Sequence, residues 1–189
     1  MSESKKLGAS LGWKLLESEV LDESLFSKVY RDKIDCDGRK ITYTYLKSPG
    51  AVFVVPVTEE GKFVLIKNYR WTVDEACWEV PAGIVADRKD MPFDAIAKDE
   101  MYEEAGCVGG EFHSLGKVFS ANGIVNITLH LFLAVNVKRV KSAPEAGEKI
   151  LEVKEVTRAE LETMLDTNQI SDGDSVMILL LALRKLSCL

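Results

Sequence analysis

The segment that most constrains the fold is a predicted helix whose apolar face also carries acidic side chains. Residues 92–105 form this helix, because Pro92 suits a first turn and Gly106 suits a helix end. Asp90 is the predicted cap. Each residue of an ideal helix turns by about 100°, so Lys98 points away from the apolar side. The predicted buried face consists of five apolar residues: Phe93, Ile96, Ala97, Met101 and Ala105.

Two glutamates fall inside this apolar stripe. Glu100 and Glu104 are four residues apart, and Glu103 lies at the edge of the stripe. Burying a carboxylate is strongly unfavourable unless a cation or a hydrogen-bond donor compensates its charge. Two carboxylates one helical turn apart suit a hard divalent cation such as Mg²⁺ or Mn²⁺. The alternative is a solvated acidic helix with a differently oriented apolar face.

The rest of the chain predicts two groups of strands and two terminal helices. Alternating residues predict three strands near the N-terminus, with a turn at Asp37-Gly38, which would form a small antiparallel sheet. Beyond Ser48-Pro49-Gly50, strands and helices alternate in an order that predicts a mixed sheet with helices on its faces. The predicted strands are 13–20, 26–34, 40–47, 51–57, 63–67, 78–80, 116–119, 128–135 and 150–156, and the predicted helices are 158–165 and 174–186, the second capped from within 171–174.

Composition and charge exclude several classes of protein. The net charge of −6 over 189 residues argues against sequence-independent binding of nucleic acid, which needs a basic surface. The four cysteines are scattered and there are two histidines, so neither a zinc site nor a disulfide framework is expected. The polar first ten residues lack the apolar core of a signal peptide, and the apolar run 176–183 is too short to span a bilayer. We therefore expect a cytoplasmic protein, and the final Ser-Cys-Leu is interpreted as a chance match to a peroxisomal address.

The sequence around the helix resembles the Nudix box, G-x5-E-x7-R-E-U-x-E-E-x-G-U, where U is a bulky apolar residue. The second half matches completely if Cys107 counts as apolar. Several further segments, in order between Trp13 and Leu186, resemble the ADP-ribose and nucleotide-sugar pyrophosphatase branch of this family. They are Gly50-Ala51-Val52, Lys67-Asn68-Tyr69-Arg70, Trp78-Glu79-Val80-Pro81-Ala82-Gly83, Thr128-Leu129-His130-Leu131-Phe132-Leu133-Ala134 and Gly147-Glu148…Glu152-Val153.

The resemblance implies an architecture and an activity. Residues 49–189 would form a Nudix-type α/β/α sandwich with a mixed sheet, and residues 1–48 a small antiparallel sheet for dimerisation and base recognition. The expected protein is a homodimer that binds a small nucleotide sugar and neither a nucleic acid polymer nor a membrane. The implied reaction is hydrolysis of the diphosphate bridge of a nucleoside diphosphate sugar, ADP-ribose above all, to a nucleoside monophosphate and a sugar phosphate. It would require Mg²⁺ or Mn²⁺.

The resemblance also assigns roles to single residues. The metal ligands would be Glu100 and Glu104, assisted by Glu103 and by the main-chain carbonyl of Ala82, with Gly83 allowing close approach of the backbone. Glu148 would be the general base or water-orienting group, or else an ordinary exposed glutamate. Arg70 is the candidate phosphate clamp, with a surface arginine beside Trp71 as the alternative. Base stacking is assigned to two aromatic residues for which core packing is equally plausible: Phe26 and Tyr43.

The chain departs from the box in three places. The loop 84–91 is two residues longer than the pattern. Arg88 and Lys89 within it are expected to face solvent, with contact to the substrate as the alternative. The first box glutamate is missing, with Asp87 and Asp90 as possible replacements. Asp99 stands where the box has an arginine that braces a helix glutamate, and it repels Glu103 weakly at four residues' distance.

These departures leave open how well the chain catalyses the reaction. A second hypothesis is a degenerate, weakly active or non-catalytic nucleotide-sugar-binding domain. A third is a Nudix enzyme for another substrate, such as a dinucleoside polyphosphate or a capped nucleotide. Downstream, Asn122-Gly123 replaces the Pro-Gly of the branch, and since Asn-Gly forms competent turns we expect this loop to be retained.

Overall fold

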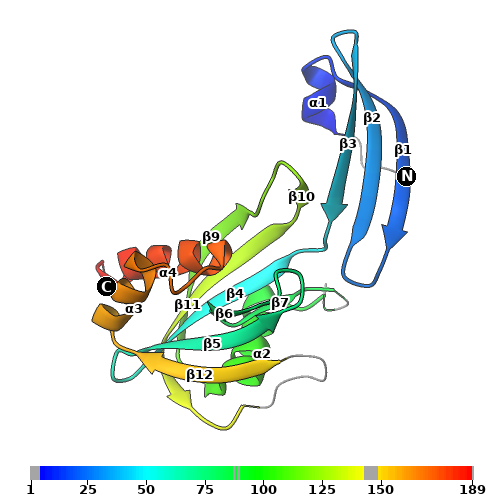
Figure 1. The fold of residues 1–189 in the computed structure, drawn as a ribbon. Coiled ribbons are helices and arrows are strands. Elements are labelled where there is room, and N and C mark those ends of the chain that lie inside the picture. Colours follow the sequence, from blue (N-terminus) through cyan, green and yellow to red (C-terminus); the bar gives the residue numbers. More distant parts are fainter. Residues whose placement is uncertain (1–4, 87, 89, 143–148, 189) are drawn as a thin grey trace. The chain divides into compact units, whose positions relative to one another are not determined.

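The computed structural model describes residues 5–86, 88, 90–142 and 149–188 (Figure 1). These residues form two compact units, each of which is described by itself. The first unit combines Met1–Pro49 with Phe119–Thr128, and the second combines Gly50–Val118 with Leu129–Leu189. That residues 1–48 serve dimerisation and base recognition stays a prediction.

The first unit is a four-stranded sheet in the order β1-β2-β3-β10, preceded by a short helix. The pairings β1–β2 and β2–β3 are antiparallel, which confirms the predicted small sheet. Asp37 and Gly38 both have positive φ angles, of 53° and 86°, as a two-residue hairpin of the predicted kind requires. The sheet is not wholly antiparallel, however, because the fourth strand is parallel to β3 and comes from much later in the chain. The elements are α1 (Lys6–Ser10), β1 (Lys14–Glu23), β2 (Lys28–Cys36), β3 (Arg39–Lys47) and β10 (Val125–Asn126).

The second unit is built on an eight-stranded sheet whose central path runs β12-β5-β4-β11-β8. Strand β4 is parallel to β11 and antiparallel to β5 and β7, so the sheet is mixed, as predicted. Strand β6 extends the pairing of β5, and β9 pairs with β11. The strands are β4 (Ala51–Thr58), β5 (Phe63–Arg70), β6 (Glu75–Glu79), β7 (Ala82–Ile84), β8 (Cys107–Val108), β9 (Glu111–Phe119), β11 (Thr128–Arg139) and β12 (Ile150–Val156).

Helices cover both faces of this sheet. Strand β4 is buried along almost its whole length, which requires cover on two sides. On one side Val52 and Val54 join a core cluster with Ile96 and Met101 of α2 (Phe93–Ala105). Figure 1 shows α4 (Gly173–Leu186) on the other side, next to α3 (Arg158–Asp166). The arrangement is the expected α/β/α sandwich, and no helix of the described chain is long and apolar enough to cross a membrane.

The box helix differs from its prediction at its beginning. It starts at Phe93, with Pro92 in the cap position and no side-chain cap, so the predicted cap by Asp90 is wrong. Phe93 is 39% exposed and stacks on His130 with ring centroids 3.6 Å apart, so its assignment to the buried face is also wrong. The other four apolar residues of that face are buried as predicted. The first turn of α2 extends past the edge of the core. The helical period of the sequence shows which side of a helix is apolar, but it does not show where along the helix the core ends.

Gly106 ends α2 in the left-handed conformation, with φ 58°. A Cβ atom at this position would lie 2.4 Å from the Val140 carbonyl oxygen and 2.7 Å from the Ser142 nitrogen, both of them backbone atoms. Since backbone atoms cannot move aside as cheaply as the end of a flexible side chain, the site requires glycine for space as well as for conformation.

We therefore expect Gly106→Ala to destabilise the protein more than the matched variant Gly61→Ala. Gly61 also has a positive φ, of 75°, but nothing lies within 4 Å of the added Cβ. Gly61→Ala should lower the free energy of unfolding by about 1–2 kcal/mol through conformational strain alone. Gly106→Ala should lower it by at least about 1 kcal/mol more, through the steric clash. Urea-induced unfolding of both variants measures the difference, and equal losses would contradict the role of the close approach.

Candidate functional site

The turn before α2 is fixed by hydrogen bonds to two neighbouring elements. The Val80 N–H donates to the buried Ser175 hydroxyl at the start of α4, at 3.1 Å. The Pro81 carbonyl accepts from the Val54 N–H at 3.0 Å. Ala82 and Gly83 then pair with β4. These hydrogen bonds fix the backbone of the turn relative to β4 and α4, and so fix the backbone groups that face α2.

Two carboxylates of α2 are buried against this turn. Glu100 is 4% exposed and Glu104 is 2% exposed, although both are ionisable. The Ala82 N–H donates to Glu104 Oε2 at 2.7 Å. A Cβ atom on Gly83 would lie 2.0 Å from Glu100 Oε1, so the carboxylate occupies space that only glycine leaves open. The prediction that both glutamates lie on the buried face is confirmed, and the alternative of a solvated acidic helix is wrong.

The inserted loop contributes a cation to the same place. The guanidinium of Arg88 forms an ion pair with Glu100 and donates to the Ile84 carbonyl at 3.1 Å. Its side chain is 27% exposed, so the expectation that Arg88 faces solvent is wrong. Lys89 and Asp87 lie outside the described residues. Asp90 is exposed.

Arg70 is held by a second buried carboxylate, that of Glu79. Its Nε donates to Glu79 Oε1 at 2.8 Å and its Nη2 to Oε2 at 2.5 Å, which is a bidentate pair. The hydrogen bonds to Glu79 raise the pKa of Arg70, and the charges of Glu104 and Asp172 raise it further. The Arg70 side chain is 45% exposed, so both interpretations, a phosphate clamp and a surface arginine beside Trp71, stay predictions.

Glu79 itself was missed as a member of the site. It is 3% exposed, and this burial raises its pKa while the Arg70 guanidinium opposes the rise. The sequence signal was available, because a charged residue between Trp78 and Val80 in a buried strand end needs a partner. Glu79 thus orients the Arg70 guanidinium through two hydrogen bonds.

The two aromatic residues predicted to stack on a base are separated by the structure of the first unit. Tyr43 is 40% exposed and lines a cavity of about 700 Å³, where its ring lies 6.5 Å from that of Trp13. Phe26 is 52% exposed in the turn between β1 and β2 and is not among the residues that line the cavity. Core packing does not describe either of them. Trp13 is a further wall of the cavity.

The same cavity has a buried charge in its wall and the expected turn at its edge. Asp32 is buried and accepts hydrogen bonds from the hydroxyls of Ser18 and Tyr45, at 2.6 and 3.1 Å. Burial, together with the charge and the hydrogen bond of Asp32, raises the pKa of Tyr45 to about 12. The Asn122-Gly123 turn lines the cavity, and the N–H of Ile124 donates to the Ala121 carbonyl at 2.9 Å. The expectation that this loop is retained as a turn is confirmed.

Comparisons with known proteins show what the chain is similar to. No family model matches the chain. It is 26% identical over 165 residues to the ADP-ribose pyrophosphatase of Bacillus subtilis (strain 168), covering 84% of this chain and 88% of that one. It is 26% identical over 182 residues to the GDP-mannose pyrophosphatase of Escherichia coli (strain K12), with 87% and 92% covered. A crystal structure of an ADP compounds hydrolase has the same fold, with a TM-score of 0.80 over 93% and 94% of the two chains at 17% identity.

These similarities support the resemblance of the chain to the Nudix pyrophosphatases. The resemblance implies a divalent cation, and the oxygen atoms near Glu100 and Glu104 can be compared with the ligands that such a cation prefers. Mg²⁺ is usually bound through one or two carboxylates, with water and substrate phosphates completing its shell. Glu100, Glu104 and the Ala82 carbonyl supply oxygen donors of this kind, so the donor chemistry fits. The described residues contain no group of three or more His, Cys, Asp or Glu side chains placed to hold a metal ion by themselves.

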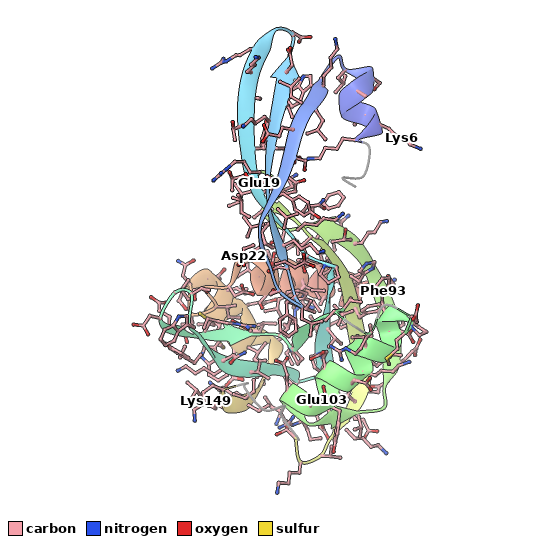
Figure 2. The ribbon with its side chains drawn as sticks, turned by 90° about the vertical axis from the view of Figure 1, so that its right-hand side faces the viewer. Lys6, Glu19, Asp22, Phe93, Glu103 and Lys149 are labelled. Carbon is pink, nitrogen blue, oxygen red and sulfur yellow. The ribbon has the colours of Figure 1, made fainter. Side chains whose placement is uncertain are left out.

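Two further predictions for this site are not decided by the geometry. Glu103 is half-buried near the end of α2 opposite Phe93 (Figure 2), and its role as an assisting ligand or catalytic group stays a prediction. Glu148 lies outside the described residues, so its role as general base also stays a prediction. Asp99 is exposed on α2, in the place of the box arginine.

The close contact of Gly83 with Glu100 leads to a test of the Nudix site. We expect Gly83→Ala to change the free energy of unfolding by less than about 1 kcal/mol, because the obstructing atoms are the movable end of a side chain. The same variant should weaken Mn²⁺ binding by about 10–100-fold, since Glu100 must leave its position. Isothermal titration with MnCl₂ measures the affinity. Gly173→Ala, where the added Cβ meets nothing within 4 Å, is the matched control and should bind Mn²⁺ like the wild type.

Proposed function

We propose that the protein hydrolyses the diphosphate bridge of a nucleoside diphosphate sugar of the ADP-ribose kind, yielding a nucleoside monophosphate and a sugar phosphate. The observation that carries the proposal is the burial of Glu100 and Glu104 against the backbone of Ala82 and Gly83. Two carboxylates held at fixed places one helical turn apart suit a divalent cation. The similarity to an ADP-ribose pyrophosphatase and to a GDP-mannose pyrophosphatase supports this class of substrate.

The reaction is phosphoryl transfer to water, in which positioning and charge neutralisation supply most of the catalysis. A bound divalent cation neutralises phosphate charge and lowers the pKa of the attacking water. Glu100, Glu104 and the Ala82 carbonyl would hold it, with Mg²⁺ or Mn²⁺ as the proposed ion. The hydrogen bond from the Ala82 N–H fixes Glu104 for this task.

Arg70 is the proposed phosphate ligand. Arginine has five N–H donors, and the pairing with Glu79 uses Nε and Nη2. The guanidinium is thereby held in one plane and can present Nη1 to a phosphate oxygen. Glu103 and Glu148 are the proposed groups for orienting the attacking water or removing its proton.

The proposal is tested by incubating the protein with ADP-ribose, GDP-mannose and UDP-glucose in the presence of Mg²⁺ or Mn²⁺. We expect nucleoside monophosphate release that stops when the metal is chelated. Glu104→Gln should lower kcat by at least about 100-fold, because it removes the charge that holds the cation. Glu162→Gln, on the exposed ion pair with Arg158, is the matched control and should not alter kcat.

Other outcomes of this assay would support the other hypotheses. Tight binding of a nucleotide sugar without turnover would contradict the proposal and favour a non-catalytic binding domain. Release from dinucleoside polyphosphates or capped nucleotides alone would favour a Nudix enzyme for a different substrate.

We further propose that the protein is a homodimer and that Tyr43 stacks on the nucleoside base. Stacking of a base on an aromatic ring contributes about 1–3 kcal/mol. Tyr43→Ala should therefore raise KM for ADP-ribose by about 5–150-fold while kcat changes little. Tyr43→Phe retains the ring and should retain the wild-type KM, as measured by steady-state kinetics. A rise in KM with Tyr43→Phe as large as that with Tyr43→Ala would show that stacking is not the reason.

A further inference from the structure

Arg88 is a feature of this chain that the box pattern does not contain. It lies in the insertion between β7 and α2, and its guanidinium pairs with the carboxylate of Glu100. Exposed ion pairs contribute little, but the Glu100 side chain is only 6% exposed. Because removing one partner of a buried pair leaves an uncompensated charge, this contact has consequences for Glu100 that a surface pair would not have.

The backbone around Arg88 fixes where its side chain begins. The Arg88 N–H donates to the Val85 carbonyl at 2.7 Å, and the Arg88 carbonyl accepts from the Met91 N–H at 3.0 Å. Val85 is itself buried and donates to the Gly50 carbonyl at 2.9 Å. Ala86, also buried, has a φ of 40°, which a residue with a side chain adopts only where its surroundings require it. The loop is thus tied to β4 immediately before it presents the guanidinium.

Glu100 is confined from two sides by this arrangement. Gly83 Cα lies against its carboxylate on one side, since an added Cβ would overlap Oε1. Arg88 binds the same carboxylate and reaches the Ile84 carbonyl, one residue beyond Gly83. An ionised carboxylate has about four acceptor positions, so a bond from arginine leaves acceptor capacity for another cation.

The residues of α2 do not supply this cation themselves. The box position for arginine holds Asp99, which is exposed and negatively charged. The adjacent Lys98 pairs with Asp94 one turn earlier on the helix, at 2.8 Å. The positive charge therefore comes from the inserted loop, at the place where the chain has lost it from the helix.

We propose that Arg88 is a positioning residue that orients Glu100 for metal binding, in the role that the box gives to an arginine at position 99. The inference rests on the proposed function of the site, since Glu100 is positioned there for a divalent cation. It also accounts for the joint occurrence of the insertion and of Asp99: the longer loop lets an arginine reach the helix from outside it.

The test compares Mn²⁺ affinity, kcat and KM for ADP-ribose in the full-length protein and its Arg88 variants. Arg88→Ala should weaken Mn²⁺ binding by about 10–100-fold and lower kcat by about 100-fold, with a smaller change in KM. Arg88→Lys retains the charge without the planar fork and should recover part of both losses. The double variant Arg88→Ala/Asp99→Arg should recover most of the loss in kcat, because it returns the charge to the helix.

Controls separate positioning from a merely structural role. Arg158→Ala removes another arginine–glutamate pair of the second unit, an exposed one, and should leave Mn²⁺ affinity and kcat as in the wild type. If Arg88→Ala does not fold, as judged by circular dichroism, Arg88→Gln replaces it with the same expectation. A folded Arg88 variant with wild-type Mn²⁺ affinity and kcat would overturn the inference, and so would a failure of both Arg88→Lys and the double variant to recover anything.

The outcome for Arg88 can be told apart from the outcome for the proposed function. If the wild type binds Mn²⁺ but releases no nucleoside monophosphate, the proposed function fails and the Mn²⁺ affinities of the variants still decide the role of Arg88. If the wild type binds no Mn²⁺, both are overturned.

Discussion

The burial of two carboxylates on α2 is the constraint on which the rest of the site depends. Glu100 and Glu104 lie in a region from which water is largely excluded, where an uncompensated charge is strongly unfavourable. Each is compensated by a different means: Glu104 by a backbone N–H and Glu100 by an arginine. The anchoring of the 80–83 turn to β4 and α4 follows from this need, since a compensating backbone group is effective only at a fixed distance.

Most of the fold could be predicted from the sequence, because long periodic segments carry a strong signal. The long strands of the second unit and helices α2, α3 and α4 were found where the periodicity of the side chains indicated them. The elements that were missed are α1, β7, β8 and β10, which have two to five residues and so complete too little of any period. Their positions are set by partners distant in sequence, as when Ala82 pairs with Phe53.

The candidate site was predictable to the extent that it follows from one helix. The direction of Glu100 and Glu104 came from the helical period, and their burial confirmed it. The partners of these charges did not follow, because Arg88 and Glu79 act through contacts that depend on how a loop and a strand end are folded. For the same reason, the sequence alone suggested that Asp99 impairs catalysis. The effect of losing a positive charge at this position depends on the charges that other segments bring to the site.

The pairing of β10 with β3 has a consequence for how the N-terminal unit can form. Two residues from beyond position 124 complete a sheet whose other strands end by Lys47, and the Ser48 N–H donates to the Asn126 carbonyl as part of that closure. During synthesis, about two thirds of the polypeptide must therefore be made before β10 can pair with β3. Until then, one edge of the N-terminal sheet has no partner strand. For the same reason, grafting this unit onto a relative would require two separate stretches of sequence to be exchanged together.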